Sequence, residues 1–254
     1  MARAALEGEG LPLPVPGATY LKVRWGASVT TRMALLACVG VDEEGFREVL
    51  AVEVAGPEKG AAYASLLRGL IDRGPKGVRL AVSDDHEGIE TAVAGEQLAG
   101  VGWQRCVVHF ERNVLSHVPA SSMSEVAEDL KAIFEVRREK TALALAEEFV
   151  ELYAKRFPKA VGVFEAGVGD ALAYLRYYPG SHHARLRTTN MLERSLEEAK
   201  RRARAVGVFP NETSASTLAT EIALRSSEEW ALKRHLTMDA LEEAEKPNPQ
   251  LSRH

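Results

Sequence analysis

The chain has 254 residues, of which 46% are hydrophobic, so it can bury one large core or two small ones. Its net charge of −4 argues against a protein coated in nucleic acid, so any DNA contact must come from a local basic patch. It contains no apolar run of membrane-spanning length, no signal peptide in residues 1–10, and only two cysteines, Cys38 and Cys106, which argue for a reducing compartment. We therefore expect a cytoplasmic protein without a membrane partner.

The first part of the chain is rich in predicted strands. Residues 18–26 alternate polar and apolar side chains, 32–41 form a nearly continuous apolar run, and 46–56 alternate again. Residues 42–45, Asp-Glu-Glu-Gly, have the length of a hairpin turn, so an antiparallel meander is predicted. Three prolines precede it, and proline is confined to strand edges and strand starts. We expect residues 1–17 to be irregular.

A helix, a strand, a second helix and a second strand are predicted after the meander. Apolar residues recur at helical spacing over 62–71, and Gly74-Pro75 ends this helix. Residues 78–85 predict a strand, 86–97 a helix and 101–110 a fifth strand. Together with the meander, these elements predict a mixed α/β sheet.

The middle of the chain is predicted to be helical. The stretches 124–134 and 141–157 have 3.6-residue periodicity, and Ser124 is a candidate N-cap. Residues 163–179 predict another helix, weakened by two glycines.

Two more helices are predicted near the C-terminal end. The first begins near Thr189 or Asn190 and ends at Gly207, and the second covers residues 216–234. The first is amphipathic because its apolar side chains recur on one face, at Leu192, Leu196, Ala199 and Ala203.

Asp84 and Glu193 are candidate catalytic carboxylates. Asp84 ends a predicted strand, where α/β sheets usually place ligands, and Glu193 lies beside the apolar stripe in the first turn of its helix. Both also have a structural explanation. Asp84 and Glu87 match a capping box, which the spacing alone favours, and a first-turn Glu interacts favourably with the helix dipole.

Cys106 and His109 have the spacing of half a zinc site. Cys38 is the only other thiol, and no second pair of residues has a zinc spacing. On a strand, moreover, Cys106 and His109 face opposite ways. A buried cysteine and a hydrogen-bonded histidine are therefore the favoured interpretation.

Basic residues gather between positions 182 and 204. A solvated helix face is the usual explanation of such a run. Positive charge beside a candidate carboxylate, however, suits a phosphate backbone, which is bound mainly through lysine and arginine. The candidate DNA-binding residues are Arg187, Arg194, Lys200, Arg201, Arg202 and Arg204.

Four motifs, in this order, resemble the Mutator-like transposases of bacterial insertion sequences: "LAVSDDHEG", "WQRCVVHFERN", "TTNMLERSLEEAKRRARAVGVFPN" and "EEWALKRHLTMDAL". The resemblance runs over about residues 6–241. It implies a ribonuclease-H-like fold, which is a mixed five-stranded sheet with flanking helices and a helical insertion. The expected division begins with an irregular or degraded segment at 1–17 and the first part of the core at 18–110. The insertion follows at 111–180, then the last part of the core with the basic helix at 181–241 and a disordered tail at 242–254.

The resemblance also implies a site of three carboxylates that holds two divalent ions, Mg²⁺ or Mn²⁺. Such a site cleaves DNA and transfers strands between transposon terminal inverted repeats and target DNA. Asp84 matches the second carboxylate and Glu193 the third, while Lys200, on the same helix face, would contact a DNA phosphate. Cys106 and His109 match the C-x-x-H signature of the family and are expected to shape the site without binding zinc.

The first carboxylate of the family stands directly before "ATY", where this chain has Gly17. Because glycine offers no ligand, we expect weakened metal binding and an inactive enzyme. We attribute "LPLPVPG" to an out-of-frame passage in a decayed gene, and we expect an N-terminally truncated chain. The alternative is a non-catalytic remnant that binds DNA or pairs with intact transposase. A homo-oligomer is also possible, and so is a translated pseudogene without a role of its own.

Overall fold

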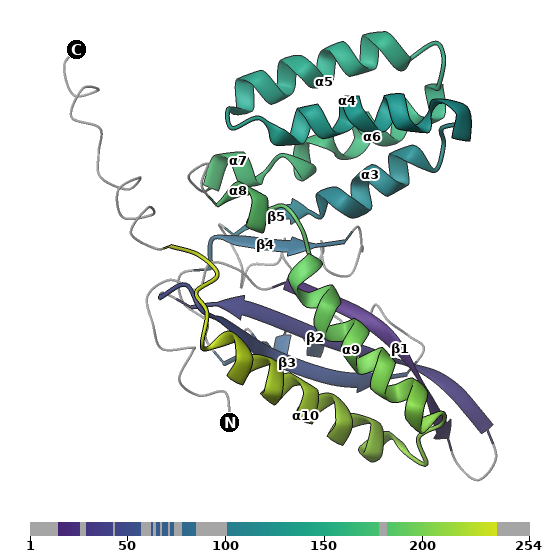
Figure 1. The fold of residues 1–254 in the computed structure, drawn as a ribbon, viewed down its shortest axis with the longest axis vertical. Helices are drawn as coiled ribbons and strands as arrows, with labels where there is room; N and C mark the ends of the chain where they lie inside the picture. Colours follow the sequence, from purple (N-terminus) through teal and green to yellow (C-terminus); the bar gives the residue numbers. More distant parts are fainter. Residues whose placement is uncertain are drawn as a thin grey trace.

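The structure is a computed structural model, and it describes residues 15–25, 29–42, 44–56, 78–84, 101–177 and 182–237, together with a few positions between 62 and 73. These residues form a mixed α/β protein, as expected. A sheet with two long helices occupies one half of the molecule, and a group of helices occupies the other (Figure 1). The predicted helix at 86–97 and the tail at 242–254 lie outside the described residues.

The predicted meander is confirmed. Strands β1 (Val15–Trp25), β2 (Val29–Val41) and β3 (Arg47–Ala55) form an antiparallel sheet in the order β1-β2-β3. The turn before β3 closes because Asp42 Oδ1 accepts hydrogen bonds from the amides of Glu44, at 3.0 Å, and Phe46, at 2.8 Å. Gly45 supplies the positive φ of 88° that this turn requires.

Strand β1 begins earlier than expected. Pro16 and Gly17 lie opposite Cys38 and Ala37 of β2, so the end of the proline-rich segment belongs to the sheet. The carbonyl of Lys22 and the amide of Arg24 point away from β2, toward Phe209. Pro16 is an even number of residues from both, so its backbone nitrogen also points away from β2. The missing N–H of Pro16 therefore costs no hydrogen bond with β2.

The single five-stranded sheet expected from the sequence is not what the described residues form. Strands β4 (Leu80–Ser83) and β5 (Gly102–Arg105) make a separate two-stranded parallel sheet. β4 lies next to β1, yet no ladder joins them among the described residues (Figure 1). β4 has only four residues, and Phe209 forms an isolated bridge with β1 at Val23.

The strand expected over 101–110 is confirmed in its first half and wrong in its second half. β5 ends at Arg105, and helix α3 (Val107–Leu115) begins two residues later. A short Val-Val run suits a strand or a helix equally well. Val107, Phe110 and Val114 recur at helical spacing and are all buried, which fixes the helix.

The middle of the chain is helical, as predicted. It contains α3, a short 3₁₀ turn, α4 (Met123–Glu135), α5 (Glu139–Tyr153), α6 (Pro158–Ala171) and α7 (Tyr174–Tyr177). Aromatic rings fill its centre: Phe149 and Phe164 have centroids 4.5 Å apart, and Phe110 packs 5.9 Å from Phe164. This cluster is continuous with the core under the sheet.

Two helix boundaries in the insertion differ from expectation. Ser124 lies inside α4, which begins at Met123 after Ser122. The helix expected over 163–179 is two helices, because the chain turns after Ala171 and the amide of Tyr174 donates to Gln104 Oε1 at 2.7 Å.

The last part of the chain returns to the meander. After α8 (His183–Leu186), helices α9 (Asn190–Val206) and α10 (Glu212–Trp230) cover one face of the three-stranded sheet (Figure 1). The predicted apolar stripe of α9 is buried, and Gly207, with φ 79°, ends the helix as expected. Asn211 caps α10 by accepting from the amide of Ser214 at 2.8 Å. None of the described helices is long and apolar enough to span a membrane.

Candidate active site

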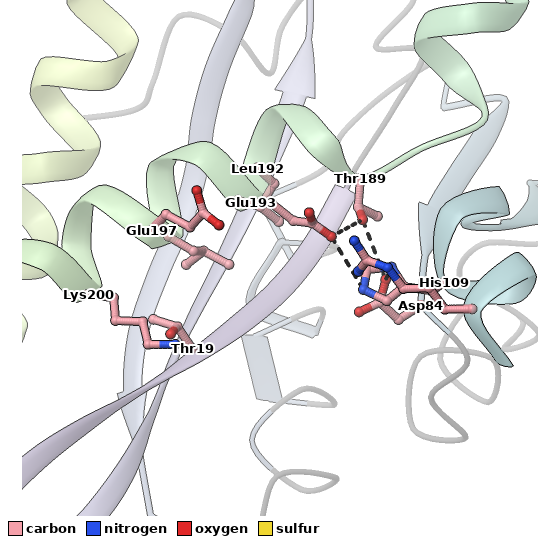
Figure 2. Close-up of a pocket in the computed structure, with 10 residues that line it drawn as sticks. Thr19, Asp84, His109, Thr189, Leu192, Glu193, Glu197 and Lys200 are labelled. Carbon is pink, nitrogen blue, oxygen red and sulfur yellow. Dashed lines mark hydrogen bonds and ion pairs between the residues drawn. The ribbon is translucent and has the colours of Figure 1, made fainter. Parts of the chain in front are cut away.

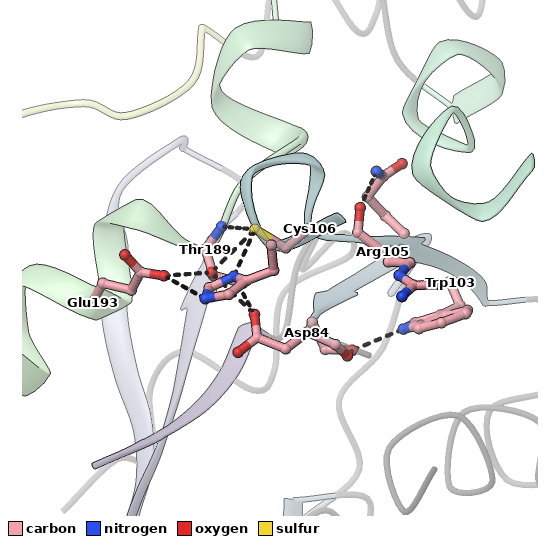
Figure 3. Close-up of polar contacts among 9 residues, drawn as sticks. Asp84, Trp103, Arg105, Cys106, Thr189 and Glu193 are labelled. Carbon is pink, nitrogen blue, oxygen red and sulfur yellow. Dashed lines mark hydrogen bonds and ion pairs between the residues drawn. The ribbon is translucent and has the colours of Figure 1, made fainter. Parts of the chain in front are cut away.

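Asp84 lies directly after β4, as predicted. The strand end is fixed by Ser83, which is fully buried: its carbonyl accepts from the amide of Cys106 at 2.7 Å, and its hydroxyl accepts from the Trp103 indole at 2.8 Å. The half-exposed carboxylate of Asp84 points toward α3 and α9 (Figure 3). The alternative capping partner, Glu87, lies outside the described residues.

Glu193 reaches the same place from the first turn of α9. Its amide donates to the carbonyl of Thr189, the N-cap residue, at 3.1 Å. The neighbouring Leu192 is buried, so α9 is held in a rotation that turns Glu193 to the side of its apolar stripe. Its carboxylate faces His109 (Figure 2).

The ring of His109 lies between the two carboxylates. Its Nδ1 is 2.8 Å from Asp84 Oδ1, and its Nε2 is 3.3 Å from Glu193 Oε1. The hydrogen bond to Asp84, followed by the contact with Cys106, raises the pKa of His109 from 6.5 to about 10. The shift favours the protonated ring at neutral pH.

The hydroxyl of Thr189 also contacts both carboxylates. It is 3.5 Å from Asp84 Oδ1 and 3.3 Å from Glu193 Oε1 (Figure 3). The Thr189 hydroxyl therefore lies between the two carboxylates. Thr189 is itself 3% exposed, so its position is set by packing.

Cys106 contacts both Thr189 and His109. Its buried sulfur accepts from the amide and the hydroxyl of Thr189, both at 3.4 Å, and lies 3.3 Å from His109 Nδ1. Burial raises the pKa of the thiol, but the hydrogen bonds from His109 and Thr189 outweigh burial and lower it overall. The sulfur thus connects the start of α3 to the start of α9.

The expectation that Cys106 and His109 face opposite ways is wrong. It assumed a strand, whereas residues 107–115 form α3, with Cys106 as its N-cap. Three residues apart at the start of a helix, the two side chains lie on the same side. The place of His109 between the carboxylates and the role of Thr189 were both missed. The "TTN" and C-x-x-H motifs were the signals that pointed to them.

These groups line a cleft of about 250 Å³. Thr19 of β1 forms one wall, and Glu197 and Lys200 extend the site along α9 (Figure 2). Position 17 has the same parity on β1 as Thr19, so Gly17 and Thr19 share a face of the sheet.

The predicted DNA-binding residues are distributed around α9. Arg201 and Arg202 both pair with Glu198, at 2.7 Å, while Lys200 lines the carboxylate cleft. Arg204 lies in a neighbouring groove on the side of β1, and Arg194 lies in a third cleft between α9 and α10. Arg187, beyond the helix, donates to the carbonyl of Phe134.

The comparison with known families shows which family the chain belongs to. The profile described as "Transposase, Mutator family" matches residues 5–233. The chain belongs to the Mutator family of transposases. The curated relatives agree. This Mutator-family chain is 38% identical over 230 residues to the transposase for insertion sequence element ISRM5 of Rhizobium meliloti. It is 30% identical over 228 residues to that for IS1081 of Mycobacterium tuberculosis, and 29% identical over 227 residues to that for IS256 in transposon Tn4001 of Staphylococcus aureus.

The alignments cover most of this chain but a smaller share of its relatives. They include 90% of the chain and 57% of the ISRM5 protein, 89% and 54% for IS1081, and 89% and 57% for IS256. The chain therefore spans little more than half the length of the curated Mutator-family transposases it matches.

The two carboxylates are groups of the chemical kind that suits the divalent cation that the family implies. An imidazolium occupies the space between two carboxylates that come from distant parts of the chain, so the surroundings already accommodate positive charge. Carboxylate oxygens are the ligands that Mg²⁺ and Mn²⁺ prefer. Among the described residues, Asp84, Cys106 and His109 are the set whose candidate ligand atoms all lie within 4.8 Å of one another, and Glu193 does not belong to it. A zinc ion there would need the sulfur that already accepts two hydrogen bonds from Thr189.

Proposed function

We propose that this chain is the catalytic part of an insertion-sequence transposase, whose ancestral reaction is DNA cleavage and strand transfer at element ends. The observation that supports it best is the pair Asp84 and Glu193, facing one another across His109 in a Mutator-family chain. DNA, as terminal repeats and as target, is the proposed partner.

The proposed chemistry is hydrolysis of a phosphodiester followed by transesterification. Water attacks phosphorus, the bond from phosphorus to the 3′ oxygen breaks, and that oxygen leaves as a 3′-hydroxyl. That 3′-hydroxyl then attacks a phosphorus of the target strand, the bond from this phosphorus to the target's own 3′ oxygen breaks, and the target strand leaves with a 3′-hydroxyl that takes up the proton. Asp84 and Glu193 would hold the cation, which when bound supplies a Lewis acid that activates the nucleophile and stabilises the leaving oxygen.

The surrounding residues have supporting roles in this proposal. Thr189 keeps the two carboxylates at a fixed separation through its hydroxyl, and Cys106 holds Thr189. Lys200 adds positive charge in the same cleft, where a DNA phosphate would lie.

We also propose that the chain derives from a ribonuclease-H-like core. The antiparallel order β1-β2-β3, the parallel pair β4-β5 and the position of β4 next to β1 support this derivation. Helix α9 then returns after the insertion to bring Glu193 to the end of β4.

A second candidate is a non-catalytic remnant that binds DNA or intact transposase. The feature that favours it is Gly17: the family resemblance places the first carboxylate at this position, and Gly17 shares a face of β1 with Thr19, which lines the cleft. With two carboxylates instead of three, we propose that metal binding is weak and cleavage impaired.

A nicking assay separates the two candidates. Supercoiled plasmid is incubated with the chain and Mg²⁺ or Mn²⁺, and the Glu193→Gln variant serves as the control for contaminating nuclease. Nicking that the variant loses supports the enzyme. DNA binding that is salt-sensitive and unaffected by Glu193→Gln, without any nicking, supports the remnant.

A further inference from the structure

A second groove, of about 440 Å³, lies beside the carboxylate cleft along the outer edge of β1. Lys200 of α9 lines both hollows, so the two are adjacent. The other charged residues that line the second groove are Lys22, Arg32 and Arg204, and Tyr20 lines it too. No acidic side chain lines this groove among the described residues.

The four cations of the groove differ from other basic residues nearby. Arg201 and Arg202 are paired with Glu198, and Arg225 of α10 is paired with Glu221 at 2.8 Å. In the part of the chain that the structure describes, Lys22, Arg32, Lys200 and Arg204 form no ion pair with a carboxylate. Their positive charge is therefore uncompensated within this region.

Two of these cations lie directly opposite one another. Lys22 of β1 is the register partner of Arg32 of β2, and both side chains are exposed. The Lys22 carbonyl points outward to the amide of Phe209, so this is a non-hydrogen-bonded pair, the kind in which opposing side chains come closest. Like charges so placed repel one another, and an anion bound between them removes that repulsion.

Tyr20 adds an aromatic surface to this charge. It precedes Lys22 by two positions, so it shares its face of β1, and it is 45% exposed. An aromatic ring next to several cations is the combination on which single nucleic-acid strands bind, with phosphates on the cations and a base on the ring. The edge of the groove is fixed by the Phe209 amide, which donates to the Lys22 carbonyl at 2.9 Å.

We propose that this groove binds the DNA strand next to the scissile phosphate, with its phosphates on Lys22, Arg32, Lys200 and Arg204 and one unpaired base stacked on Tyr20. The proposal rests on the proposed function, because Lys200 connects the groove to the carboxylate cleft. It specifies which surface positions the substrate strand.

The first test measures binding without metal, so that it does not depend on the carboxylates. Fluorescence anisotropy follows a fluorescein-labelled 20-nucleotide single strand in EDTA at several salt concentrations. Arg204→Gln and the pair Lys22→Gln with Arg32→Gln should each weaken binding about threefold to tenfold per charge and reduce the salt slope by about 0.7 per charge. The matched control is Arg225→Gln, which removes one charge from an ion-paired position on α10. Equal losses in the control and in the groove variants would overturn the proposal.

The second test addresses stacking. A strand carrying 2-aminopurine should lose fluorescence on binding, because the probe stacks on the ring of Tyr20. Tyr20→Phe should keep the quenching, and Tyr20→Leu should lose it and weaken binding roughly fivefold or more. Unchanged quenching in Tyr20→Leu contradicts the stacking. If millimolar inorganic phosphate displaces the labelled strand as effectively as unlabelled DNA does, the groove binds a single anion only and the strand proposal is wrong.

Two further readouts separate the groove from the active site. Without DNA, the Lys22→Gln and Arg32→Gln pair should have a raised Tm, because the opposing charges are gone; a lowered Tm contradicts the repulsion. Glu193→Gln should keep strand binding in EDTA while its Mn²⁺ binding is weakened about tenfold or more. If the groove variants bind the strand as tightly as the parent chain, the groove proposal is wrong and the carboxylate site is unaffected. If Glu193→Gln binds Mn²⁺ as tightly as the parent chain, the carboxylate site is wrong and the proposed strand contact is unaffected.

Discussion

The carboxylates of Asp84 and Glu193 face opposite nitrogens of one imidazole ring, at 2.8 Å and 3.3 Å. Asp84 follows β4 and Glu193 begins α9, so the whole helical insertion separates them along the chain. The ring between them carries positive charge where the proposed function requires a cation, and this relationship leads to the first two predictions.

Glu193→Gln should weaken Mn²⁺ binding about tenfold or more, because it replaces an anionic oxygen ligand by a neutral amide. Isothermal titration measures this directly. Glu197→Gln is the matched control, since Glu197 lies one turn later on α9 and lines the same cleft. Should Glu197→Gln produce the larger loss, the ligand assignment is wrong.

Gly17→Asp should tighten Mn²⁺ binding about tenfold, because position 17 shares a face of β1 with Thr19, which lines the cleft. Ala18→Asp adds the same charge on the opposite face and should leave the affinity unchanged. An equal gain in both variants would mean that net charge alone attracts the ion. No gain in either would count against Gly17 as the missing carboxylate position.

His235 makes stability depend on pH. Burial, followed by the nearby charges of Arg47, Arg185 and His182, lowers its pKa from 6.5 to about 4. Between these values the unfolded chain binds more protons than the folded one, so the free energy of unfolding should fall as pH drops from 6.5 toward 4, by at most about 3 kcal/mol. Urea unfolding of His235→Gln should show a shallower pH dependence over this window. A slope equal to that of the parent chain would disprove the assignment.

Two glycines of α6 should respond oppositely to alanine. A Cβ on Gly167 would lie 2.4 Å from Arg105 Nη1 and 2.8 Å from the Phe110 ring, whereas a Cβ on Gly169 meets nothing within 4 Å. Gly167→Ala should lower the free energy of unfolding by about 1–3 kcal/mol through overpacking. Gly169→Ala should raise it by up to about 1 kcal/mol through helix propensity. Urea denaturation compares them, and a stabilised Gly167→Ala would show that the insertion repacks freely there.

Helix α9 shows what the sequence determines well. Its apolar stripe and Gly207 are local signals, so both its start near Asn190 and its end were predicted correctly. The segment after Arg105 shows the limit. Two valines suit a strand or a helix, and a distant contact, the Val107 amide donating to the Arg187 carbonyl at 2.9 Å, helps set the geometry.

The candidate site follows the same division. Asp84 and Glu193 were named from motifs, but the position of His109 depends on α3 being a helix, which the apolar run did not indicate. The division of the strands into two sheets also escaped prediction, and the isolated bridge between Phe209 and β1 involves a loop with no strand pattern.

Because His109 projects from the first turn of α3, the helical insertion and the cation site share one structural element. Any change in the tilt of α3 relative to the sheet would move the His109 ring relative to Asp84 and Glu193 together. The proposed cation site would then depend on the orientation of α3 as well as on the two carboxylates.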